Sequence, residues 1–133
     1  MIPTITMLYA GLLGLLLIVL SFRVVGFRRK SGTGIGDGDS ETGARLIRAH
    51  GNFTEYVPFC LLILLLLELA GENPIALHVF GALLFLSRIA HASGLSKASG
   101  TTPGRFGGAL VTFLLLIIGS VWLIVRSVMW QMG

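Results

Sequence analysis

The sequence predicts an all-α integral membrane protein, a bundle of four spanning helices. Of its 133 residues, 54% are hydrophobic and only 12% are charged, and the mean hydropathy is +0.88. A soluble domain of this length cannot bury so much apolar surface. Four apolar stretches each approach the roughly 20 residues that a spanning helix needs. The chain is about as long as one typical domain, so we expect a single domain over residues 1–133.

The apolar stretches place the spans in order at residues 5–25, 56–70, 75–92 and 106–128. The first span has no basic segment before it and continues into a basic patch, so we interpret it as a mature helix rather than a secretory signal. The second helix should begin before the membrane, because Ser40 or Thr42 can cap its start. Pro58 should kink this helix, and Gly94 should permit the turn after the third.

Basic residues favour one orientation of the bundle. Loops with an excess of Lys and Arg tend to lie in the cytoplasm. The second loop, "GENP", contains no Lys or Arg, and its one charged residue is Glu72. We therefore expect loops 1 and 3 in the cytoplasm and the N- and C-termini outside. Arg126 can extend to the outer interface beside Trp122 and Trp130. Eight cations lie in or beside the first and third loops: Arg23, Arg28, Arg29, Lys30, Arg45, Arg48, Lys97 and Arg105.

Two other kinds of site are not favoured by the sequence. The first loop contains "GTGIGDG", but the sequence predicts neither a strand before it nor a helix opening at the glycines, so a solvated turn fits better than a phosphate loop. Metal binding is not expected: Cys60 is the only cysteine, and His50 and Glu55 diverge on their helix.

A polar face leads into the second span. Arg45, Arg48, Asn52, Glu55 and Tyr56 fall within an arc of roughly 100° on a helix, whereas His50 points nearly the opposite way. Ionisable groups at the edge of a bilayer are costly unless they serve a partner or a pathway. Two interpretations stay open: a ligand site, or intrahelical pairs such as Arg48 with Glu55 that contribute about 0.2–0.5 kcal/mol each.

The third helix carries a second polar pair. Arg88 and His91 are three residues apart in "RIAHASG" and face the same side. We expect Arg88 to form an ion pair with Glu55, because a buried cation and a buried carboxylate tend to be paired. Glu68 and His78, at the opposite ends of their helices, are interpreted as interfacial residues. Gly51 should let another helix approach closely.

The segment "RAHGNFTEYVPF", the apolar run ending in Glu68 and the later "RIAHASG" resemble the MAPEG family, the membrane-associated proteins in eicosanoid and glutathione metabolism. The resemblance covers essentially the whole chain, and its specific part is the pattern Arg-x-x-x-Asn-x-x-Glu-Tyr-x-Pro. The likeness is closer to the short bacterial members, whose first loop also tends toward "GIGDG".

The resemblance implies a homotrimer in a bacterial inner membrane that binds glutathione, as co-substrate, between subunits near the cytoplasmic side. Arg105 would activate the glutathione thiol, a match that requires a one-residue insertion in "LSKASGTTPGR". A lipophilic second substrate would arrive from the bilayer, and no nucleic acid is expected as a partner. The residues that would hold glutathione are Arg48, Asn52, Glu55, Tyr56, Arg88 and His91, with Arg28 or Arg29 reaching its carboxylates.

The implied activity is that of a glutathione-dependent transferase or peroxidase acting on lipophilic electrophiles or hydroperoxides. One departure leaves an alternative open: eicosanoid-type members carry a tyrosine where this chain has Leu95. A non-catalytic glutathione-binding or structural membrane protein therefore remains the alternative. A proton-coupled drug exporter with four helices would need an acidic residue within the first span, and "TMLYAGLLGLLLIVLSF" contains none.

Overall fold

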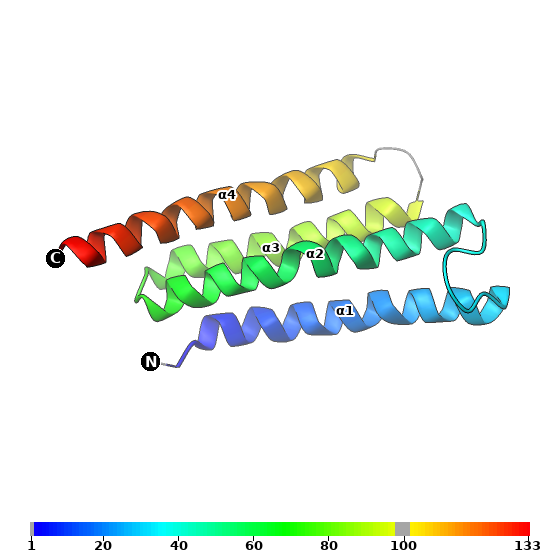
Figure 1. Ribbon diagram of the computed structural model, residues 1–133, viewed down its shortest axis with the longest axis horizontal. Helices are drawn as coiled ribbons and strands as arrows, with labels where there is room; N and C mark the ends of the chain where they lie inside the picture. Colours follow the sequence, from blue (N-terminus) through cyan, green and yellow to red (C-terminus); the bar gives the residue numbers. More distant parts are fainter. Residues whose placement is uncertain (1, 98–101) are drawn as a thin grey trace.

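The structure, a computed structural model, describes residues 2–97 and 102–133 and is an all-α four-helix bundle. Successive helices run in opposite directions, so both termini lie at one end, and loop 1, the last turn of α3 and the start of α4 lie at the other (Figure 1). Each helix is long and apolar enough to cross a membrane, which confirms the predicted fold class. The helices are α1 (Thr4–Ser31), α2 (Glu41–Leu69), α3 (Pro74–Lys97) and α4 (Pro103–Met132).

The helices extend beyond the apolar runs because capping residues set their ends. The side chain of Ser40 accepts a hydrogen bond from the backbone N of Gly43, so α2 begins before the apolar run, as predicted. Thr102 caps α4 in the same way by accepting from the backbone N of Arg105 at 3.2 Å. α1 continues to Ser31 and ends at Gly32, whose positive φ of 69° suits a glycine cap.

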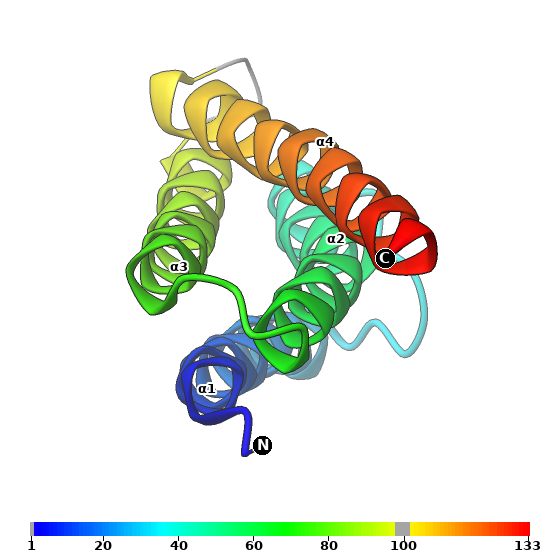
Figure 2. The same ribbon diagram turned by 90° about the vertical axis from the view of Figure 1, so that its left-hand side faces the viewer.

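Helices α2 and α3 form the centre of the bundle. α1 packs against both of them on one side and α4 packs against both on the other, while α1 and α4 do not touch each other within the described residues (Figure 2). Leu13, Leu64 and Leu84 are among the fully buried side chains. Many large apolar side chains, such as Phe22 and Ile117, are exposed on the outside, as expected of a surface that faces lipid.

Glycines bring α3 and α4 close together at the end of the bundle that carries loop 3. A Cβ atom at Gly108 would collide with the backbone of Ser87 and with His91, and one at Gly94 would collide with the start of α4. The predicted turn at Gly94 is therefore wrong: α3 continues to Lys97, and Gly94 serves the packing of two helices. Gly51 faces open space, so the close approach expected there does not occur within this chain.

At the end that carries the termini, polar residues hold α1 in place. The buried carboxylate of Glu68 accepts hydrogen bonds from the backbone N atoms of Ile5 (2.8 Å) and Thr6 (2.7 Å). A residue of α2 thus caps the N-terminus of α1, and the interpretation of Glu68 as a simple interfacial charge is wrong. His78 similarly contacts the Tyr9 hydroxyl at 3.2 Å, while Arg126 forms an ion pair with Glu72 of the α2–α3 loop.

Candidate functional site

A buried arginine links three helices. Arg88 on α3 is 1% exposed; its Nη2 donates to the Asn52 side-chain oxygen on α2 at 2.8 Å, and its Nη1 donates to the Thr112 hydroxyl on α4 at 3.3 Å. The Arg88 Nε is buried and makes no hydrogen bond among the described residues. The predicted ion pair with Glu55 is wrong, since neither ion pair formed within residues 2–97 and 102–133 includes Arg88.

Glu55 pairs instead with Arg48, seven residues earlier on the same helix. The Nη1 atom of Arg48 lies 3.1 Å from Oε1 of Glu55, and the two side chains are 56% and 47% exposed. A separation of seven residues is two helical turns, which places both side chains on one face of α2. An exposed pair of this kind contributes little to stability, so it stays available to exchange partners with a ligand.

His91 joins α3 to the first turn of α4. This buried side chain places its Nδ1 atom 3.0 Å from the backbone oxygen of Arg105. A carbonyl oxygen only accepts, so Nδ1 carries the proton, and the Nε2 atom of a neutral ring is then an acceptor. His91 therefore presents a hydrogen-bonding nitrogen while it fixes the position of Arg105.

These side chains surround a pocket of about 230 Å³ near the end of the bundle that carries loops 1 and 3. It brings together four of the predicted site residues from three helices: Arg48 and Asn52 of α2, His91 of α3 and Arg105 of α4. The walls between them are apolar and comprise Leu95, Phe106 and Ala109.

The other predicted residues lie outside this lining. Glu55 is joined to the pocket through Arg48, and Arg88 is joined to it through Asn52. Tyr56 packs edge-on against Phe113 of α4, with ring centroids 5.2 Å apart.

Two further predicted residues are not part of the pocket within one chain. Arg28 and Arg29 do not line it, and α1, which carries them, makes no contact with α4 in the described parts of the chain. The Nε atom of Arg28 instead donates to the backbone oxygen of Gly36 in the first loop at 3.4 Å.

Thr112 is the site residue that sequence reasoning missed. It is fully buried, donates to the backbone oxygen of Gly108 at 2.8 Å and accepts from Arg88. The sequence feature that could have indicated Thr112 is a hydroxyl within an apolar run. Thr112 follows Arg105 by seven residues and therefore lies on the same face of α4.

Comparison with known proteins decides the family of this chain. Residues 6–125 match the sequence profile of the MAPEG family. The chain belongs to the MAPEG family. The inner membrane protein YecN of Escherichia coli strain K12 is 32% identical over 118 residues, which cover 86% of this chain and 88% of that protein. YecN of E. coli O6:H1 shows the same identity and coverage. No solved structure matches the chain.

In this MAPEG protein, the α2 residues on which the resemblance rests include three that face α3 or α4. Asn52 contacts α3 through Arg88, Tyr56 contacts α4 through Phe113, and Arg48 lines a pocket with residues of both. Leu95, which stands where eicosanoid-type members carry a tyrosine, lines that same pocket. The packing agrees with the helical phase predicted for Arg48, Asn52 and Tyr56, whereas Arg45, predicted on the same face, lines a different pocket with residues of α1.

Proposed function

We propose that this MAPEG protein is a glutathione-dependent transferase or peroxidase of the inner membrane that acts on lipophilic electrophiles or hydroperoxides. The observation that carries the proposal is the pocket in which Arg48, Asn52 and His91 meet Arg105. The similarity to YecN, an inner membrane protein, supports the proposed location.

The donor set suits glutathione. This tripeptide carries two carboxylates, one ammonium group and a thiol. Arginine binds carboxylates in a bidentate manner, so Arg48 suits a glutathione carboxylate, and Glu55 is the nearby carboxylate that an ammonium group would require. The exposed Arg48–Glu55 pair would open so that each partner bonds to the group of opposite charge on the ligand.

Arg105 would then act on the sulfur. A thiol with a reference pKa near 8.5 is only a few per cent thiolate at neutral pH, and a close guanidinium favours the anion. In a transfer, the thiolate sulfur forms a bond to the electrophilic carbon of the second substrate, and the leaving group departs from that carbon with its bonding electron pair. In a peroxidase reaction, two glutathione molecules are oxidised to the disulfide while a hydroperoxide is reduced to an alcohol and water.

A homotrimer would complete the site. Arg28 and Arg29 do not line the pocket within one chain, so in this proposal a neighbouring subunit supplies them for the glutathione carboxylates. Loops 1 and 3 would lie in the cytoplasm, where Lys and Arg concentrate. The bilayer would deliver the lipophilic substrate along the exposed apolar faces of the bundle.

A non-catalytic glutathione-binding protein is the second candidate. The observation that favours it is the apolar Leu95 in the pocket wall, where a tyrosine would supply a hydrogen-bond donor. The two candidates differ in one measurable property, the ionisation of the bound thiol.

The test is the ultraviolet absorbance of the glutathione thiolate bound to detergent-purified protein. The parent protein should show a thiolate band near neutral pH. Arg105→Leu should still bind glutathione while the pH at which the band appears rises by roughly one to two units, the effect expected from one close cation. Lys30→Leu removes a cation of α1 outside this pocket and should behave like the parent. Binding without a thiolate band in the parent would favour the non-catalytic candidate, and absence of glutathione binding would contradict both.

A further inference from the structure

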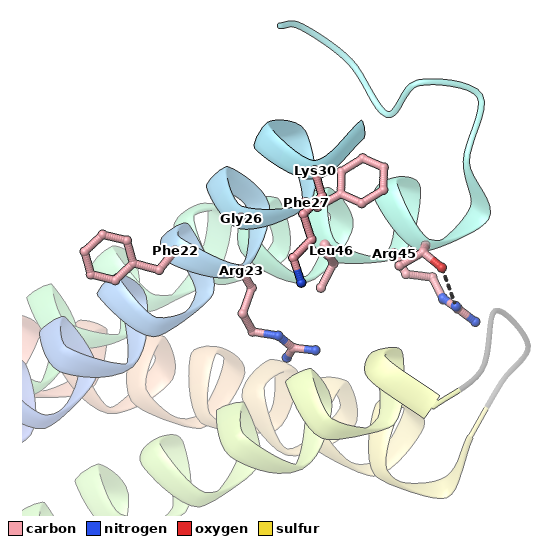
Figure 3. A pocket seen from close by; sticks show the side chains of 8 residues that line it. Phe22, Arg23, Gly26, Phe27, Lys30, Arg45 and Leu46 are labelled. Carbon is pink, nitrogen blue, oxygen red and sulfur yellow. Dashed lines mark hydrogen bonds between the residues drawn. The ribbon is translucent and has the colours of Figure 1, made fainter. Parts of the chain in front are cut away.

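A second polar pocket lies at the same end of the bundle, between α1 and α2. It has a volume of about 410 Å³ and is separate from the site described above, with which it shares no lining residue. Three of its lining side chains are cations: Arg23 and Lys30 of α1 and Arg45 of α2. Figure 3 shows the charged ends of Arg23 and Lys30 on the same side of α1.

Among the described residues, no carboxylate lines this pocket. The ion pairs in the described parts of the chain are Arg48–Glu55 and Arg126–Glu72, and neither involves a cation of the pocket. Arg45 donates to the hydroxyl of Thr42, which is a neutral partner (Figure 3). A pocket lined by three cations and no carboxylate favours an anion.

The walls of the pocket are fixed by packing between the two helices. A Cβ atom at Gly43 would collide with the ring of Phe27, so the absence of a side chain there lets this ring seat against the start of α2. Gly26 lines the pocket without a side chain, and no atom lies within 4 Å of the place where its Cβ would be. The cavity is therefore a built feature of the α1–α2 contact.

An apolar groove begins where this pocket ends. The groove lies between α1 and α3, has a volume of about 370 Å³ and includes Leu16, Val19, Leu20 and Ile89 in its lining. Arg23 lines both the groove and the cationic pocket. On α1, residues 16, 19, 20 and 30 are three, four or seven residues from Arg23, so they lie on the same side of the helix as Arg23. An apolar track therefore leads from the cations toward the middle of the expected span.

We propose that the cationic pocket and the groove together bind one anionic phospholipid. Arg23, Lys30 and Arg45 hold its phosphate, and an acyl chain occupies the groove between α1 and α3. The chemistry of the two parts matches the two parts of the lipid, since basic pockets between spanning helices suit anionic headgroups and the groove is lined, apart from Arg23 and Ser93, by apolar side chains. The lipid assignment is independent of glutathione.

The headgroup contact is tested by native mass spectrometry of the detergent-purified protein with added phosphatidylglycerol or phosphatidylcholine. The parent should retain phosphatidylglycerol in preference to phosphatidylcholine. In Arg23→Gln/Arg45→Gln, phosphatidylglycerol binding should fall by about fivefold for each lost cation. Arg28→Gln/Arg29→Gln removes the same charge from the end of α1 outside the pocket and should retain the lipid. Equal losses in the two double variants would show diffuse attraction and overturn the proposal.

The acyl contact is tested with a matched pair of bulky substitutions on α3. Ile89→Trp fills the groove, whereas Leu86→Trp lies one turn earlier at an exposed position outside it. Only Ile89→Trp should reduce phosphatidylglycerol retention. Glycerol phosphate, which has no acyl chain, should not displace the lipid at concentrations where a second phosphatidylglycerol species does. Displacement by glycerol phosphate, or equal effects of the two tryptophans, would show that the pocket binds a phosphate group without an acyl chain in the groove. Either result would contradict the lipid proposal.

Discussion

At the scale of single residues, Arg88 has the most unusual environment. Its guanidinium is buried within a membrane bundle, and the groups that bond to it, Asn52 and Thr112, are neutral. A buried cation without a carboxylate is costly, and such residues in spanning helices usually serve a ligand or a pathway. Arg88 bonds to Asn52, which lines the pocket together with Arg48 and Arg105. We therefore interpret the site as built to receive an anionic ligand.

The Arg88–Asn52 bond predicts unequal effects on stability. Asn52→Leu removes the acceptor but leaves the buried cation, so it should destabilise the protein by about 1–3 kcal/mol. Arg88→Met removes the charge together with the need for a partner and should cost less. The double variant should recover much of the stability that Asn52→Leu loses. Unfolding of the four proteins in one detergent measures this coupling, and additive effects would show that the bond is unimportant.

The two faces of α2 predict unequal effects on binding. Arg48→Ala removes a cation from the pocket and should weaken glutathione affinity by about 1.5–3 kcal/mol, the scale of a hydrogen bond to a charged group. His50→Ala should change the affinity little, because the Nε2 atom of His50 contacts the Ser21 hydroxyl of α1 at 3.1 Å. Isothermal titration calorimetry measures both. A larger effect at His50 would contradict the assignment of the site to this pocket.

At the scale of helices, hydropathy was sufficient for the number and order of the elements but not for their ends. Capping sets those ends, and it depends on local side chains such as Ser40 and Thr102. The cap that Glu68 gives to α1 could not be predicted, because it requires knowing that the end of α2 lies beside the start of α1.

The polar face of α2 could be predicted because its residues share one helix and one period. The partner of Glu55 could not: the choice between Arg48 on the same helix and Arg88 on the next depends on how deeply α3 sits in the bundle. Contacts within a helix follow from sequence spacing, whereas contacts between helices follow from packing.

Packing between helices gives a matched pair of glycines in "RFGGAL" on α4. A Cβ at Gly108 would collide with Ser87 and His91 of α3, while one at Gly107 has open space around it. Gly108→Ala should therefore destabilise the protein by about 1–3 kcal/mol through overpacking. It should also weaken glutathione binding, since it displaces α4, which carries Arg105, from His91. Gly107→Ala should do neither. Thermal unfolding and calorimetry measure the two effects, and equal behaviour of the glycines would contradict this packing.

At the scale of the whole molecule, the pocket and the first-helix arginines predicted to serve it belong to different parts of the bundle. α4 flanks the pocket on one side, and α1, with Arg28 and Arg29 at its end, lies across the bundle from α4 (Figure 2). In the proposed homotrimer, two chains contribute to each glutathione site. Closed symmetric assemblies satisfy that requirement identically at every interface.

Subunit mixing tests the shared site. Arg48→Ala removes a pocket cation, and Arg28→Gln/Arg29→Gln removes the arginines that we assign to the neighbouring subunit, so each variant alone should bind glutathione weakly. Co-expression at equal levels should restore strong binding to roughly one site in four, because an intact site then needs an intact pocket on one chain beside intact arginines on the next. Titration of the whole co-expressed pool with glutathione, purified through a tag that both variants carry, measures this fraction. Mixing the two purified variants in detergent without exchange of subunits is the control and should restore nothing. If the co-expressed assembly binds no better than its parts, the arginines act within their own chain or not at all, and the shared site is wrong.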